Sequence, residues 1–206
     1  ATQTEYFMTH YWDNFPFNDT SAISKPQVSE RAFADFVYLL NNLPPQTSEK
    51  GIGILMDKAA VSPEMLLYFS KLSEKYLYDP NSPMRNEPLF EYFLDAVIHS
   101  PAIDETHKIR PKMLLKTVQK NKPGTKATDF DYTLPDGSTH KLSMLPSEYV
   151  ILYFYNPECH ECAAVKEKLV SSTVINTLQQ KGQLKILALY PDENLETYRK
   201  HLPEMP

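Results

Sequence analysis

Two apolar runs in the last third of the sequence, separated by one helical segment, constrain the fold more than any other feature. The first run is YVILYFY at 149–155, and the second is LKILALY at 184–190. Uninterrupted β-branched and aromatic residues are typical of strands that are buried on both faces of a parallel sheet. Residues 158–181 between the runs have a helical pattern. This order predicts one βαβ unit with a right-handed crossover.

A short motif lies where the first of these strands meets the helix. Cys159 and Cys162 are separated by two residues and are the only cysteines in the chain. Cys159 therefore falls at the helix N-terminus, where unpaired N–H groups and the helix dipole favour an anion such as a thiolate. Cys162 lies nearly one turn further on, on the same side. We expect Cys159 to be the exposed, attacking residue and Cys162 to be the sheltered residue that resolves a mixed disulfide.

The CxxC spacing allows three uses of the pair. A zinc site needs about four ligands, and the sequence has no second cysteine pair and no His-x3-5-His pair. A structural disulfide that closes so small a loop adds little stability. Redox exchange is favoured, because CxxC in this context is typical of redox motifs. Metal binding and an inert structural pair stay open as alternatives. Since the cysteines would themselves be the redox centre, no metal and no small-molecule cofactor is expected.

Three charged residues flank the cysteines. A protonated His160 would lower the pKa of Cys159, whereas the carboxylates of Glu158 and Glu161 disfavour a neighbouring thiolate. Each also has a structural interpretation: His160 as a solvated helix residue, and the glutamates as partners of the helix dipole. With two acidic neighbours, we expect a reductant or mild exchanger rather than a strong oxidant.

The residues before 121 are predicted to be almost wholly helical. The aromatic-rich segment 1–25 reads as an irregular arm, in which Trp12 and its aromatic neighbours pack on the helices rather than form a ligand cage. Pro111 is expected to kink the last helix. Apolar periodicity and Pro-containing starts and stops predict helices at 26–43, 48–60, 63–77, 87–99 and 103–120.

A change of pattern at NKPGTKA, residues 121–127, marks a domain boundary. Alternation around the PDG turn at 135–137 predicts a hairpin, and the residues after 190 begin another helix. The predicted fold class is therefore α+β overall. An all-helical domain at 1–121 is followed by an α/β domain at 122–206.

Charge and hydropathy exclude some classes of function. The net charge of -5 argues against a nucleic-acid binder, which usually has a basic face. The longest apolar run, 149–155, is far shorter than the roughly 20 residues of a membrane-spanning helix. The chain begins at Ala1 without an apolar leader, so we expect that a leader was removed or trimmed; a lipid anchor is left open.

The segment from about 123 to 206 resembles the thioredoxin superfamily, in its TlpA/ResA and peroxiredoxin-like branch. The residues that carry the resemblance are PGTKATDFDYTLPDGSTHKLSML and YVILYFYNPECHEC. Upstream, HYWDNFPFNDT and KYLYDPNSPMRNEPLF are similar to a helical domain of unknown function that precedes such modules in secreted proteins of some Gram-negative bacteria. The resemblance implies a thiol-disulfide oxidoreductase in the periplasm, acting on protein thiols or disulfides with a redox partner protein. The alternative is a non-enzymatic protein-interaction module with the thioredoxin-like half as a scaffold.

The chain departs from the family pattern at two points. Glu158 stands where the family usually carries Trp, and no strand follows Pro203, which lies at a plausible distance for the family's cis-Pro. The resemblance therefore implies an incomplete thioredoxin-like domain, truncated before the cis-Pro hairpin, with weakened activity. Its open sheet edge is expected to be covered by the helical domain or by a second copy in a homodimer.

Overall fold

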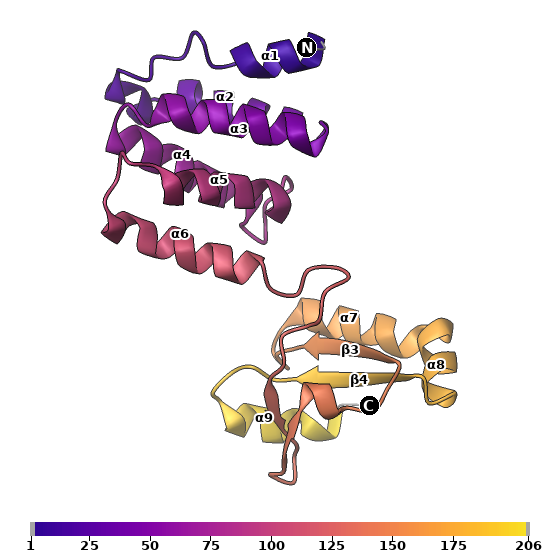
Figure 1. The fold of residues 1–206 in the computed structure, drawn as a ribbon. Coiled ribbons are helices and arrows are strands. Elements are labelled where there is room, and N and C mark those ends of the chain that lie inside the picture. Colours follow the sequence, from indigo (N-terminus) through magenta and orange to yellow (C-terminus); the bar gives the residue numbers. More distant parts are fainter. Residues whose placement is uncertain (1–2, 205–206) are drawn as a thin grey trace. The chain divides into compact units, whose positions relative to one another are not determined.

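The computed structural model describes residues 3–204. The chain divides into two compact units (Figure 1), Ala1–Ala127, here called the helical unit, and Thr128–Pro206, here called the C-terminal unit. The α+β class expected from the sequence is confirmed. The helical unit contains α1 (Gln3–His10), the 3-10 helix η1 (Thr20–Ser24), α2 (Pro26–Leu40), α3 (Pro45–Ala59), α4 (Pro63–Leu77), α5 (Glu87–His99) and α6 (Glu105–Val118).

Local sequence explains where these helices begin. Ser62, Asn86 and Asp104 are the N-caps of α4, α5 and α6, and each side chain accepts a hydrogen bond from the backbone N–H three residues later. Proline occupies the first position of α2, α3 and α4, where its missing N–H costs nothing. The helices predicted from periodicity are confirmed, with ends that differ by a few residues. The last of them, α6, continues through Pro111.

The irregular arm expected for residues 1–25 is wrong in part, because α1 and η1 lie within it. Side chains four residues apart lie on one face of α1, where the rings of Tyr6 and His10 stack at 4.0 Å. Met8 on the same helix is buried. The apolar contacts of this helix outweigh the modest helix propensity of its aromatic and Thr residues.

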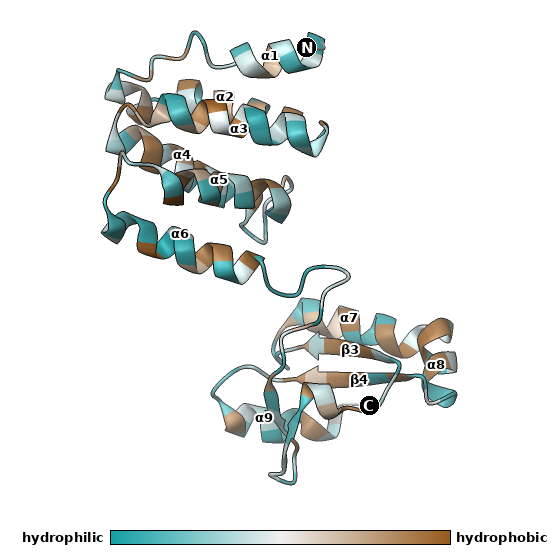
Figure 2. Ribbon diagram, viewed as in Figure 1, coloured by the Kyte–Doolittle hydropathy of each residue, from teal (hydrophilic) through white to brown (hydrophobic). Residues whose placement is uncertain are grey.

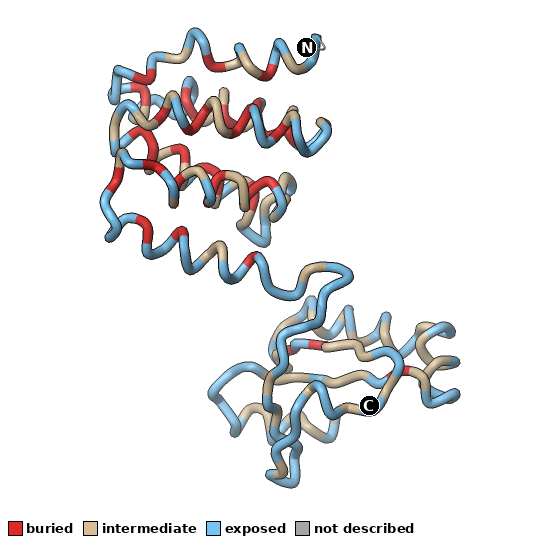
Figure 3. Tube along the Cα trace, viewed as in Figure 1, coloured by how far each residue is buried: buried red, intermediate tan, exposed pale blue. Residues whose placement is uncertain are grey.

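The expected packing of Trp12 on the helices is confirmed, since its side chain is only 1% exposed. Five aromatic rings surround the indole, with centroid distances of 5.1 to 6.1 Å. They belong to Tyr11, Phe15, Phe17, Phe36 and Phe69. In Figure 3 the buried positions of this unit are concentrated along its helices, which therefore enclose an apolar core.

The C-terminal unit contains two small sheets. An antiparallel hairpin pairs β1 (Asp131–Thr133) with β2 (Thr139–Lys141), as predicted. The second sheet pairs β3 (Tyr149–Phe154) with β4 (Leu184–Leu189) in parallel, with Tyr149 opposite Leu184. The remaining elements are η2 (Leu142–Met144), α7 (His160–Ser171), α8 (Thr173–Gln180), α9 (Leu195–His201) and η3 (Leu202–Glu204). The βαβ order is thus present, with α7 and α8 in the crossover.

The single helix expected at 158–181 is wrong, because Ser172 divides it into α7 and α8. Ser172 has extended backbone angles, and its hydroxyl accepts a hydrogen bond from the N–H of Ile175 at 3.4 Å. Serine side chains compete with helical backbone bonds in this way and favour N-caps over helix interiors. The break therefore follows from a capping serine and not from Gly or Pro.

The strands β3 and β4 are not buried on both faces as expected. Much of both strands is coloured hydrophobic in Figure 2, yet most of their residues are only half-buried or exposed in Figure 3. Tyr149 and Phe154 are 51% and 57% exposed. Within residues 128–204, the sheet formed by β3 has two strands, so each strand has a neighbour on one edge only. Too few elements pack on this sheet to cover its apolar side chains.

Candidate active site

The turn between β3 and α7 is closed by Asn156. Its backbone oxygen accepts a hydrogen bond from the N–H of Cys159 at 3.0 Å, and its side-chain oxygen accepts one from the N–H of Glu158 at 2.9 Å. Asn side chains favour such turns because they can bond the backbone two residues on. The turn places Cys159 at the N-cap of α7 with extended backbone angles.

The sulfur of Cys159 takes the place of a capping oxygen. The backbone N–H of Cys162 donates to this sulfur at 3.2 Å. The N–H groups of a first helical turn have no intrahelical partner, so a thiolate here gains hydrogen bonds and the favourable end of the helix dipole. The pKa of Cys159 is accordingly lowered, first by a hydrogen bond from the Cys162 side chain and then by the backbone of Cys162.

Cys162 has the opposite shift. Its hydrogen bond to Cys159 raises the pKa of its thiol, while the backbone of Asn156 lowers it by a smaller amount. The geometry thus favours a thiolate on Cys159 and a protonated thiol on Cys162. Both cysteines are half-buried. The expected contrast between an exposed Cys159 sulfur and a sheltered Cys162 sulfur stays a prediction.

Glu158, His160 and Glu161, the neighbours of the cysteines, are all exposed. The charge of Glu161 raises the pKa of Cys159, although its backbone acts in the other direction. The charge of Glu158 acts on a different group, the phenol of Tyr190, whose pKa it helps to raise after burial and Asp192. Within the described part of the chain, no hydrogen bond or ion pair joins His160 to either sulfur. Of the three, Glu161 is the residue whose charge acts on the thiol of Cys159.

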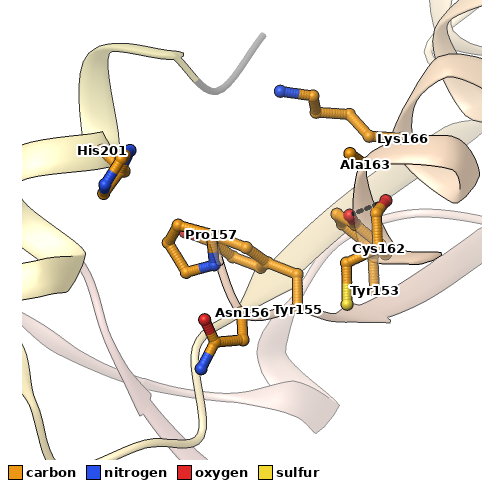
Figure 4. Close-up of a pocket in the computed structure, with 8 residues that line it drawn as sticks. All are labelled: Tyr153, Tyr155, Asn156, Pro157, Cys162, Ala163, Lys166 and His201. Atoms are coloured by element: carbon orange, nitrogen blue, oxygen red, sulfur yellow. Dashed lines mark hydrogen bonds between the residues drawn. The ribbon is translucent and has the colours of Figure 1, made fainter. Parts of the chain in front are cut away.

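Tyr153 belongs to the site, although the sequence argument did not single it out. Its side chain is buried at 8% exposure, and its hydroxyl donates a hydrogen bond to the backbone oxygen of Cys162 at 2.7 Å (Figure 4). The signal available in the sequence was a phenol within an apolar strand directly before the motif, because a buried Tyr hydroxyl usually has a hydrogen-bond partner.

Cys162 lines two hollows on the C-terminal unit. The smaller one, drawn in Figure 4, has a volume of about 40 Å³ and is also lined by Tyr153, Tyr155 and Pro157. The other is open to solvent, has a volume of about 510 Å³ and is lined by Phe154 and Pro191 among others. An open, partly apolar surface therefore lies beside the CxxC motif.

Among residues 3–204 there is no cluster of three or more His, Cys, Asp or Glu side chains that could hold a metal ion. In the same residues, no helix is long and apolar enough to cross a membrane.

The family described as "Domain of unknown function (DUF5106)" matches residues 1–121, more than half of the chain. The chain belongs to the DUF5106 family. A crystal structure of a thioredoxin-like protein from Bacteroides caccae ATCC 43185 is similar to this DUF5106 chain, with a TM-score of 0.85 and 41% sequence identity. The similarity covers 98% of this chain and 73% of that chain. It shows that the C-terminal unit has a thioredoxin-like fold.

A second solved structure is the C-terminal domain of an uncharacterized protein from Bacteroides fragilis NCTC 9343. It is 44% identical to this DUF5106 chain and matches with a TM-score of 0.40. The match covers 41% of this chain and 61% of that chain. The comparison with curated proteins found no match.

Proposed function

We propose that this protein is a thiol-disulfide oxidoreductase in which Cys159 and Cys162 are the redox pair. The observation that carries the proposal is the position of the Cys159 sulfur at the N-cap of α7, where it accepts the N–H of Cys162 at 3.2 Å. This arrangement stabilises the nucleophilic form of one cysteine and keeps its neighbour protonated. A thioredoxin-like fold is compatible with this chemistry.

The reaction transfers two electrons from the pair to a client disulfide. The Cys159 thiolate attacks one client sulfur, the client S–S bond breaks, and the departing client thiolate takes up a proton. Cys162 then loses its proton and attacks the Cys159 sulfur, which releases the second client sulfur as a thiol. The protein is left with a Cys159–Cys162 disulfide. A dithiol protein partner must reduce that disulfide before another cycle.

The charges near Cys159 are the reason that we propose a reductant or mild exchanger and not a strong oxidant. The carboxylate of Glu161 opposes the lowering of the Cys159 pKa. Strongly oxidising CxxC proteins owe their potential to a very stable thiolate, so a thiolate with an opposing charge belongs to a reductant or a mild exchanger. Our proposal includes an exported, periplasmic location and membership of the TlpA/ResA and peroxiredoxin-like branch, because the motif order of the C-terminal unit resembles that branch.

Mechanism-based trapping tests the proposal. With Cys162→Ser, the mixed disulfide on Cys159 has no resolving thiol and should accumulate. Mass spectrometry then identifies the captured client, which must be released by a reducing agent. The matched control is Cys159→Ser, which keeps one cysteine but lacks the attacking thiolate and should capture nothing. Equal capture by the two variants would contradict the assignment of roles.

The same variants separate the oxidoreductase from the alternative, a protein-interaction module with the thioredoxin-like unit as a scaffold. An interaction module needs neither thiol, so a variant with both cysteines replaced by Ser would keep its partners in a pull-down. An oxidoreductase loses its covalent clients in that variant. Retention of every partner would favour the scaffold.

A further inference from the structure

We propose that Tyr153 is a positioning residue that fixes the resolving cysteine, Cys162, to the sheet of the C-terminal unit. The inference rests on the proposed exchange function and adds a residue outside the CxxC motif to it. The Tyr153 hydroxyl donates to the backbone oxygen of Cys162 at 2.7 Å, and the Tyr153 side chain is buried.

The bond joins a regular strand to the least constrained part of a helix. Tyr153 lies within β3, where it is paired with Ala188 of β4. Cys162 lies in the first turn of α7, which begins at His160. Helix ends fray, because their first N–H groups have no intrahelical partner. A carbonyl oxygen has two lone pairs, so it can accept the phenol as well as its own helical bond. The bond therefore restrains the turn that carries the resolving sulfur.

Neighbouring rings hold the phenol in its orientation. Tyr153 stacks on Tyr155 with a centroid distance of 5.5 Å and an interplanar angle of 12°. Tyr155 contacts Tyr190 at 6.1 Å, and Tyr190 stacks on Tyr198 of α9 at 5.6 Å. This row of four tyrosines connects β3, the residue after β4 and α9. The Tyr153 hydroxyl is thus fixed by packing as well as by its hydrogen bond.

The phenol also keeps its proton when the cysteines ionise. Burial raises the pKa of Tyr153, and the charges of Cys162 and Cys159 raise it further. A thiolate on either cysteine makes ionisation of Tyr153 less favourable, so the hydroxyl remains a donor during exchange. Replacement by Phe removes only this donor and keeps the ring in the stack.

The step that should depend on Tyr153 is resolution. In the mixed disulfide, Cys162 must reach the sulfur of Cys159 within the same chain, and a loosened first turn lowers the fraction of time that it is in reach. One net hydrogen bond corresponds to about a threefold to tenfold change in rate. The first attack by Cys159 on a small disulfide does not need Cys162 to move, so it should change by less than about twofold at a pH where Cys159 is fully ionised.

Stopped-flow reaction of the full, reduced chain with dithiobis-nitrobenzoate, an aromatic disulfide, separates the two steps. Attack by Cys159 releases one coloured thiolate in a phase that depends on reagent concentration. Resolution by Cys162 releases the second in a phase that does not. Tyr153→Phe should slow the second phase by about threefold to tenfold. The matched control is Tyr198→Phe, which makes the same chemical change in the same row of rings, away from Cys162, and should leave both phases unchanged.

The outcomes distinguish this inference from the proposed function. A second phase that is equally fast in Tyr153→Phe and wild type, or equally slowed in Tyr198→Phe, overturns the positioning role and leaves the exchange function intact. Absence of a second phase in the wild-type protein overturns the exchange function and the inference with it. A circular dichroism melt shows whether Tyr153→Phe is folded. If the C-terminal unit of that variant is unfolded, Tyr153 is a stability residue and the positioning role fails.

Discussion

The backbone N–H of Cys162 points at the sulfur of Cys159 from 3.2 Å. Cys162, which we propose as the resolving residue, therefore also stabilises a thiolate on Cys159, through its backbone and through its own thiol. The two cysteines form one coupled site, in which a change to either alters the pKa of the other.

Removal of the Cys162 thiol should raise the pKa of Cys159. In Cys162→Ala the side-chain donor is lost, while the backbone N–H at the N-cap remains, so the pKa should stay below that of an ordinary thiol. The reciprocal variant, Cys159→Ala, should lower the pKa of Cys162, because its largest raising cause disappears. The rate of alkylation by iodoacetamide as a function of pH measures both values. An unchanged Cys159 pKa in Cys162→Ala would contradict the coupling.

Substitutions of Glu161 and His160 should differ in their effect on the pKa of Cys159. The Glu161 charge raises the pKa of Cys159, so Glu161→Gln should lower it. His160 is exposed and has no bond to either sulfur within the described residues, so His160→Asn should leave it unchanged. The rate of alkylation by iodoacetamide as a function of pH measures the Cys159 pKa in both variants. A larger shift from His160→Asn would restore the interpretation of His160 as the group that tunes the thiolate.

The contribution of the two cysteines to the free energy of unfolding of the reduced protein should pass through a maximum as the pH is varied. The lowered pKa of Cys159 contributes stability that is lost as the pH falls through its folded value. The raised pKa of Cys162 contributes stability that is lost as the pH rises from the unfolded value, about 8.5, through its folded value. The cysteine-dependent part should therefore rise toward pH of about 8.5 and fall above it.

Denaturant unfolding under reductant, followed by circular dichroism, measures this dependence. The difference between wild type and a variant with both cysteines replaced by Ser isolates the thiol contribution. The single tryptophan of the chain, Trp12, reports on the helical unit and serves as an internal control. A difference that does not change with pH would contradict the two opposed shifts.

Trp12 should be a principal stabilising residue of the helical unit. Its indole is fully buried among five rings, so Trp12→Ala should lower the free energy of unfolding of this unit by about 3–5 kcal/mol. Tyr38 is 65% exposed on α2, and Tyr38→Ala should change it by less than about 0.5 kcal/mol. Urea titration followed by circular dichroism compares the variants. A cost below about 1 kcal/mol for Trp12→Ala would mean that the N-terminal segment packs too loosely to stabilise the unit.

The helices of the helical unit could be predicted because the apolar periodicity and the residues at the helix ends indicate the same segments. Apolar periodicity defined each buried face, and prolines marked starts such as those of α2 and α4. The break at Ser172 could not be predicted, because serine is tolerated inside helices and only the structure shows that it caps α8. Helix α1 could not be predicted either, since its contacts are with residues distant in the sequence.

The position of the candidate site could be predicted from the sequence, but its geometry could be predicted only in part. The strand-to-helix junction placed Cys159 at a helix N-terminus, and the structure has it as the N-cap of α7. The relative exposure of the Cys159 and Cys162 sulfurs depends on how many elements pack around the motif, which the spacing does not encode. The hydrogen bond from Tyr153 depends on how α7 packs on β3. The sequence therefore indicated at most that a buried phenol needs a hydrogen-bond partner.

Turnover of a protein disulfide shows whether Cys159 and Cys162 form a redox centre. Insulin is mixed with the protein and a small dithiol reductant, and precipitation of the reduced insulin chain is followed over time. We expect wild type to accelerate the reaction over reductant alone, Cys159→Ser to abolish the acceleration, and the exposed-site control Tyr38→Ala to retain it. Equal rates for wild type and Cys159→Ser would show that the CxxC pair is not a redox centre for protein disulfides.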